Sequence, residues 1–153
     1  MISWQTCKSD FDWDGWWRDI YVLQTTIEDW RALCAALSAK YKFEFTIDGE
    51  AKSFPPSVDE VFEGRKDASA LLQFRAGNIL VTCHFFTPDE IEFDIDPREV
   101  TSQSDLDALS DLLRVIGNAV MKQVLLTLEN CRDNPIMTYD PQSSQLRYHP
   151  ATA

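Results

Sequence analysis

Carboxylates are the side chains of this sequence that are numerous enough, and suitably spaced, to do chemistry. Most of the excess of acidic over basic residues lies in one segment. Residues 86–111 contain nine Asp and Glu residues opposed only by Arg98, which gives this segment a net charge of −8 out of −11 for the chain. Four of these carboxylates alternate with apolar residues and are called the acidic stripe: Glu90, Glu92, Asp94 and Asp96. Successive side chains of a strand point to opposite faces, so all four are expected to project from one face of a sheet.

The acidic stripe is compatible with three situations: a solvated outer face, a docking surface for a basic protein, or a metal site. Carboxylates two residues apart on a strand lie about 7 Å from each other, within the Debye length of about 8 Å at physiological salt. Their field would therefore steer a cationic partner. Glu44 and Asp48 are expected to extend this surface if their strand lies close by. A flat stripe lacks the convergent loop of a calcium site, and no EF-hand spacing is present, so no metal site is predicted.

Tryptophan is the second residue type with an uneven distribution. Four of the five tryptophans fall within the first 17 residues: Trp4, Trp13, Trp16 and Trp17. We expect at least two of these rings to pin the N-terminal arm to the core. Those that do not are candidates for an aromatic hot spot, because Trp and Tyr dominate interface energetics, and a sugar-stacking platform is a weaker alternative.

Catalytic signatures are not found in this sequence. It contains no G-x-S-x-G, P-loop, G-x-G-x-x-G or H-E-x-x-H motif. His84 and Cys83 are adjacent and point to opposite faces of a strand, so they cannot form a dyad with each other. The four cysteines form no CxxC pair, and we expect reduced thiols with Cys34 and Cys83 buried. No catalytic residue and no cofactor is predicted.

Composition excludes further classes. A net charge of −11 and a pI near 4.5 argue against direct binding to nucleic acid or to an anionic membrane, which require clustered Lys and Arg. The N-terminus lacks the pattern of a secretory signal, and no apolar run is long enough to span a membrane, so a cytoplasmic protein is expected. A length of 153 residues suggests one domain, residues 1–153.

Hydrophobic periodicity predicts the elements that must position these residues. Strands are predicted at residues 18–25, 42–48, 69–75, 78–86, 90–96 and 123–128. Helices are predicted at residues 27–41, 58–64 and 104–120, the first with a Thr25–Glu28 capping box and the last capped by Ser104. Residues 1–18 read as a Trp- and Asp-rich arm, and residues 131–153 as a loop-rich tail. The predicted fold class is α+β: a single antiparallel or mixed sheet of about five to six strands, with two long helices packed on one face.

A resemblance to bacterial immunity proteins of polymorphic-toxin and contact-dependent inhibition systems is carried by five segments: 18–22 (RDIYV), 26–30 (TIEDW), 90–98 (EIEFDIDPR), 135–136 (PI) and 139–141 (YDP). Such proteins are small, acidic α/β proteins. The resemblance implies a non-enzymatic inhibitor that binds a cognate toxin tightly, and it assigns no binding residues. A basic toxin, with a nuclease as one candidate, would suit the acidic surface.

The leading functional prediction is an immunity protein that blocks a toxin's active site. The predicted partner-binding residues are Glu90, Glu92, Asp94 and Asp96, flanked by Glu44 and Asp48, with Trp13, Trp16 or Trp17 anchoring the rim. One alternative is a small enzyme or ligand-binding domain with a pocket near His84. Another is a homo-oligomeric structural component sealed by the Trp-rich arm. The oligomeric state is left open by the sequence.

Overall fold

Nine antiparallel strands form one sheet in the order β3-β2-β4-β5-β6-β1-β7-β8-β9 in the computed structural model, which describes residues 1–150. The strands are β1 (Arg18–Leu23), β2 (Glu44–Ile47), β3 (Glu50–Lys52), β4 (Ala70–Ala76), β5 (Ile79–Cys83), β6 (Glu90–Ile95), β7 (Val124–Leu128), β8 (Pro135–Asp140) and β9 (Gln145–Tyr148). The helices are α1 (Trp4–Cys7), α2 (Ile27–Lys40), α3 (Val58–Gly64) and α4 (Gln103–Val120), with 3₁₀ turns η1 (Lys8–Phe11) and η2 (Pro97–Glu99).

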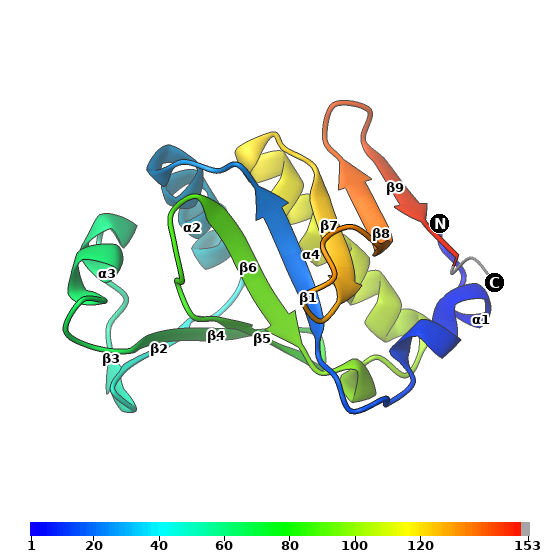
Figure 1. Ribbon diagram of the computed structural model, residues 1–153, viewed down its shortest axis with the longest axis horizontal. Coiled ribbons are helices and arrows are strands. Elements are labelled where there is room, and N and C mark those ends of the chain that lie inside the picture. The colour runs from blue at the N-terminus through cyan, green and yellow to red at the C-terminus, as the bar shows by residue number, and fades with distance from the viewer. Residues whose placement is uncertain (151–153) are drawn as a thin grey trace.

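The two long helices, α2 and α4, lie side by side on one face of the sheet, and the opposite face of β6, β1 and β7 carries no helix (Figure 1). The α+β class and the single antiparallel sheet are therefore as predicted. The predicted number of five to six strands is wrong, because the sheet has nine. Within residues 1–150, every helix is too short or too polar to cross a bilayer.

Both long helices begin with a side-chain cap close to the predicted one. The capping box of α2 is formed by Thr26 and Asp29, one residue later than expected. The hydroxyl of Thr25 is already engaged, because it donates to the Pro88 carbonyl at 2.6 Å. The cap of α4 is Ser102 rather than the predicted Ser104, and its side chain accepts from the backbone N–H of Asp105.

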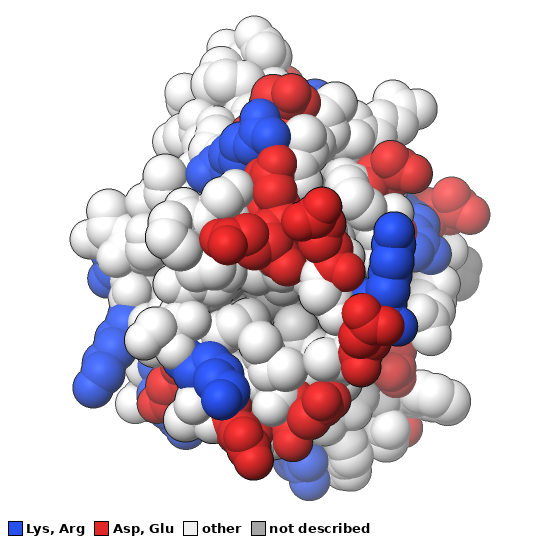
Figure 2. Space-filling view, turned by 90° about the vertical axis from the view of Figure 1, so that its left-hand side faces the viewer, with Lys and Arg blue, Asp and Glu red and all other residues white. Residues whose placement is uncertain are grey.

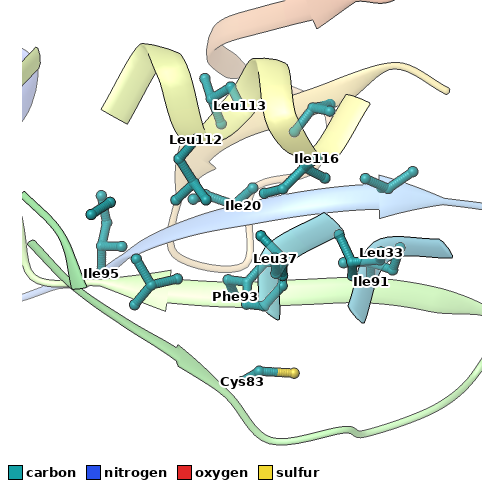
Figure 3. Close-up of a cluster of buried hydrophobic side chains, with 14 of the residues drawn as sticks. Ile20, Leu33, Leu37, Cys83, Ile91, Phe93, Ile95, Leu112, Leu113 and Ile116 are labelled. Carbon is teal, nitrogen blue, oxygen red and sulfur yellow. The ribbon is translucent and has the colours of Figure 1, made fainter. Parts of the chain in front are cut away.

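The core lies between the helices and the sheet. On β6, Ile91, Phe93 and Ile95 are at most 1% exposed, as their alternation with acidic residues predicts. These side chains belong to one buried cluster with residues of β1, α2 and α4, which Figure 3 draws, including Ile20, Leu33, Leu37, Leu112, Leu113 and Ile116. Cys34 and Cys83 are buried free thiols in the same cluster, which confirms that prediction.

The sheet bends between β5 and β6. Strand β5 ends at Cys83, not at Phe86 as predicted, and Phe85 adopts a positive φ of 55°. The ladder between β5 and β6 is limited to the pair Thr82 and Asp94. Strands β4 and β5 therefore run across the direction of β6 and β1 (Figure 1).

The two chain ends are more ordered than predicted. Residues 131–153 were expected to be loop-rich, but β8 and β9 complete one edge of the sheet; residues 151–153 of that predicted tail lie outside the described residues. Pro135 made β8 look like a loop in the sequence, but proline is tolerated as the first residue of a strand. The N-terminal arm contains α1 and η1, which bury Cys7 and Phe11. Strand β3 was also missed, because its three residues are all exposed and show no apolar alternation.

Gly117 is a position at which α4 lies close against strands β7 and β8. A Cβ atom there would lie 2.5 Å from a ring carbon of Tyr139 on β8. We expect Gly117→Ala to lower the free energy of unfolding by about 1–3 kcal/mol, because a buried helix cannot move away without losing packing elsewhere. Gly64→Ala is the matched control, since nothing lies within 4 Å of a Cβ there. Urea denaturation showing equal stability for both variants would contradict this close packing.

Candidate protein-interaction surface

The acidic stripe lies on the helix-free face of the sheet. On β6, Glu90, Glu92 and Asp94 alternate with the buried apolar residues and are only partly exposed. Asp96 follows the strand and caps η2, where its side chain accepts from the backbone N–H of Arg98. The expected common face is therefore present for the three strand residues.

Glu90 and Glu92 are both engaged by neighbouring side chains. The guanidinium of Arg132 donates to both oxygens of Glu90, at 2.6 and 3.0 Å, and lies 4.5 Å above the ring of Tyr21. The Tyr21 hydroxyl lies 2.8 Å from a carboxylate oxygen of Asp19 and 3.3 Å from one of Glu92. Burial is the main cause that raises the pKa of Glu92 above its ordinary value, and the negative charges of Asp19 and Glu90 add to this effect. Half of the stripe is thus tied into a local network.

Asp19 is the member of this network that sequence reasoning missed. It is only 3% exposed and stands beside Asp94 in the register of β1 and β6. Its carboxylate also accepts from the backbone N–H of Asn130 at 2.9 Å. The available signal was the spacing of Asp19 and Tyr21, which places both side chains on one face of a strand.

The loop between β7 and β8 covers part of this face. It crosses in front of β1 in Figure 1, and the contacts of Asn130 with Asp19 and of Arg132 with Glu90 hold it there. Tyr21, which lies beneath it, is fully buried. Burial, followed by the hydrogen bond to Asp19, raises the pKa of Tyr21. The helix-free face is therefore only partly open to a partner.

Asp94 and His84 form the remaining pair on this face. The Nε2 atom of His84 lies 3.5 Å from Asp94, and both side chains are partly exposed. Burial raises the pKa of Asp94 to about 6, with Asp19 and Glu129 adding to the effect and His84 opposing it. Asp94 is thus the carboxylate of the acidic stripe whose charge changes in a mildly acidic range.

Protonation of Asp94 couples to folding. An unfolded Asp ionises near pH 4, so between pH 4 and 6 the native state binds more protons and its stability falls as the pH rises. We expect Asp94→Asn to raise the free energy of unfolding by about 1 kcal/mol at pH 7.5, after allowance for solvent screening, and to flatten this pH dependence. Urea titrations at pH 4 and 7.5 measure both effects.

Asp96→Asn is the control for this prediction. Arg98 holds the pKa of Asp96 below its usual range, so Asp96 contributes stability above the unfolded pKa that is lost as the pH falls. The control variant is therefore expected to lose stability at pH 7.5. If Asp94→Asn is likewise less stable than the wild type at pH 7.5, the conclusion that ionised Asp94 destabilises the folded protein is wrong.

Glu44 and Asp48 do not join the acidic stripe. Strands β4 and β5 lie between β2 and β6. Glu44 is in register with Asp94 across these strands, but it is three strand spacings away, about 14 Å at the usual distance between strands. Asp48 lies in the β2–β3 turn, where its side chain accepts from the backbone N–H of Ser69. The sequence could not reveal this separation, because it does not give strand order.

Negative charge also gathers away from the stripe. Figure 2 looks onto the end of the molecule that carries α3 and β3, and it shows acidic side chains near the middle of this face above a hollow. Helix α3 contributes Asp59, Glu60 and Glu63 to this end. A mostly apolar pocket of about 180 Å³ lies between α3 and β2, with Glu60 among its lining residues. The excess charge is therefore spread over more than one surface.

Arg18 organises the segment that precedes β1. The residue is almost completely buried, at 1% exposure, and its five N–H groups make six hydrogen-bond contacts, one hydrogen of Nη1 being shared. Four go to the backbone carbonyls of Asp10, Asp12, Trp16 and Trp17, and two go to the carboxylate of Asp14. The planar fork of arginine suits several fixed acceptors at once. Arg18 therefore closes residues 12–17, here called the Trp loop, around itself.

The Trp loop presents three indole rings to solvent. Trp13, Trp16 and Trp17 are 47%, 60% and 42% exposed. Only Trp4 of the four N-terminal tryptophans packs against the core, so the expectation that at least two would do so is wrong. Arg98 stacks 3.8 Å above the ring of Trp13. The Trp loop thus holds large apolar side chains in contact with water, and exposed apolar patches of this kind often mark interaction sites.

No feature of the described residues points to a bound metal. Within residues 1–150, no three His, Cys, Asp or Glu side chains are grouped so that they could hold an ion. The arrangement instead offers exposed tryptophan rings, a residue type that is enriched at protein interfaces. In comparisons with protein-family models, curated proteins and solved structures, nothing matches this chain.

Proposed function

We propose that this protein is a cytoplasmic, non-enzymatic inhibitor of the immunity-protein type, which binds a cognate bacterial toxin domain and blocks its active site. The Trp loop is the single observation that carries the proposal. Three exposed tryptophans stand on a loop whose backbone is already fixed by Arg18. A partner could cover the exposed 42–60% of each of these tryptophans without the entropic cost of ordering the loop.

The acidic surface acts through long-range electrostatic attraction of the partner. A net charge of −11 attracts a basic partner and raises the association rate, as carboxylates do in electrostatically steered complexes. Because Glu90, Glu92, Asp94 and Asp96 already have local partners, they contribute more to steering than to the affinity of the final complex. A toxin that itself binds nucleic acid, such as a nuclease, has the cationic cleft that this surface would cover.

Co-expression with the product of the adjacent reading frame tests the proposed function. The expected result is a stable complex in which the toxin's activity and its growth inhibition are abolished, with an association rate that falls as salt increases. An association rate that does not change with salt concentration would refute the proposal that the acidic surface steers the partner. Failure to bind or protect, together with a self-associated mass in solution, would instead favour the homo-oligomeric alternative.

A second candidate function rests on the pair of His84 and Asp94. A histidine 3.5 Å from a carboxylate whose pKa is raised to about 6 could exchange protons with a substrate. The ring of His84 also stacks on exposed Phe86. If His84→Gln leaves toxin neutralisation intact, no proton transfer by this pair is needed for the proposed function.

A further inference from the structure

A polar pocket of about 400 Å³ opens next to the Trp loop. Its polar lining includes Asp10, Asp133, Asn134 and His149, and its apolar lining includes Leu128 and Ile136. It lies where the β7–β8 loop, the start of β8, η1 and the end of β9 meet. This volume is within the range of sites that take a small ligand or a large side chain.

The pocket's chemistry is that of a receptor for an organic cation. Two carboxylates line it, and none of its lining residues within the described chain is Lys or Arg. Neither Asp10 nor Asp133 forms an ion pair within residues 1–150. The apolar wall suits the methylene stem of a long basic side chain, whose charged end would reach the carboxylates.

The pocket is rigidly connected to the Trp loop. Arg18 donates from Nε to the carbonyl of Asp10 at 2.9 Å, and it stands opposite Leu128 in the register of β1 and β7. The Tyr148 hydroxyl donates to one carboxylate oxygen of Asp10 at 2.5 Å. The residue that fixes the Trp loop thus also fixes two walls of the pocket, so both surfaces are presented as one unit.

We infer that this pocket receives one arginine or lysine side chain of the protein that the Trp loop binds. This inference rests on the proposed function, because it assigns the pocket to the same basic partner. The partner's cation would lie between Asp10 and Asp133, and its neighbouring apolar residues would contact the indole rings. A guanidinium suits this site best, because its several donors can serve two carboxylates at once.

The probe for this inference is Nα-acetyl-L-arginine amide, with the uncharged isostere Nα-acetyl-L-citrulline amide as its control. The only two histidines report on binding in one NMR spectrum: His149 lines the pocket, and His84 lies on the helix-free face. We expect the arginine probe to shift the ring signals of His149 and not those of His84, with a dissociation constant of about 1–10 mM, as for a single weakly held side chain. The citrulline probe is expected to shift neither.

Asp133→Asn keeps the shape of the pocket and removes one charge. We expect this variant to weaken the arginine probe about fivefold and the toxin complex about tenfold, and Glu63→Gln, on distant α3, is its matched control. Equal shifts with arginine and citrulline, or an unchanged response in Asp133→Asn, would overturn the inference even if the toxin is neutralised. An arginine-selective pocket in a protein that binds no toxin would overturn the proposed function alone.

Discussion

Replacing Arg18 by methionine is expected to lower the free energy of unfolding by about 3 kcal/mol, the largest effect of any single substitution in the N-terminal segment. The variant keeps the apolar stem but removes the guanidinium, which leaves the inward-facing carbonyls of Asp10, Asp12 and Trp16 without their donor. We also expect the Trp loop to lose its fixed conformation. Urea denaturation followed by circular dichroism measures the first effect, and amide hydrogen exchange at Trp16 measures the second.

Arg98→Met is the matched control, because Arg98 likewise pairs with a carboxylate and contacts a residue of the Trp loop, Trp13, but its side chain is 54% exposed. Exposed ion pairs contribute about 0–1 kcal/mol, so this variant should remain close to the wild type in stability. Arg18→Lys is expected to be intermediate, since a single ammonium cannot reach the same set of acceptors. An Arg18→Met protein as stable as the control, with unchanged exchange at Trp16, would show that the loop is held by other contacts.

The double substitution Trp16→Ala and Trp17→Ala is expected to weaken the proposed complex with a toxin about 100-fold. A 100-fold loss is about 2.8 kcal/mol, at about 1.4 kcal/mol for each factor of ten, and it corresponds to one hot-spot residue of about 2 kcal/mol together with a weaker neighbour of about 0.8 kcal/mol. Both tryptophans are exposed in the free protein, so the free energy of unfolding should change by less than about 1 kcal/mol for the two substitutions together. Surface plasmon resonance should place most of the change in the dissociation rate.

Met121→Ala is the control for this binding prediction. Met121 is 52% exposed, follows the C-terminal end of α4 and takes no part in the Trp loop. Its removal should leave the affinity unchanged. If the double tryptophan variant binds as tightly as Met121→Ala, the Trp loop is not the anchor, and the interface must be sought on another surface.

Local periodicity was enough to predict the central elements. The alternation of Glu90, Glu92 and Asp94 with apolar residues assigned one face of β6 to the core and the other to the carboxylates, because a strand has a side-chain period of two. Helical spacing likewise located α2 and α4 to within a residue or two. These predictions succeeded because each depends only on neighbours a few positions apart.

Elements that depend on a distant partner escaped prediction. Strand β8 begins with Pro135 and is stabilised by pairing with β7 and by burial of Tyr139 against Gly117 of α4. Strand β9 then pairs with β8 at the edge of the sheet. Such pairings are set by the assembled sheet, so the composition of the C-terminal segment could not reveal them.

The sequence by itself determined the α+β class, the common face of Glu90, Glu92 and Asp94 and the unusual density of tryptophan near the N-terminus. Only the tertiary structure decided which of these groups remain available to a partner. It placed Arg132, Tyr21 and His84 against the carboxylates, and it closed the Trp loop around Arg18 so that its rings face water. The physical reason is that charge compensation and exposure depend on distances across strands and loops, which side-chain periodicity along one segment does not contain.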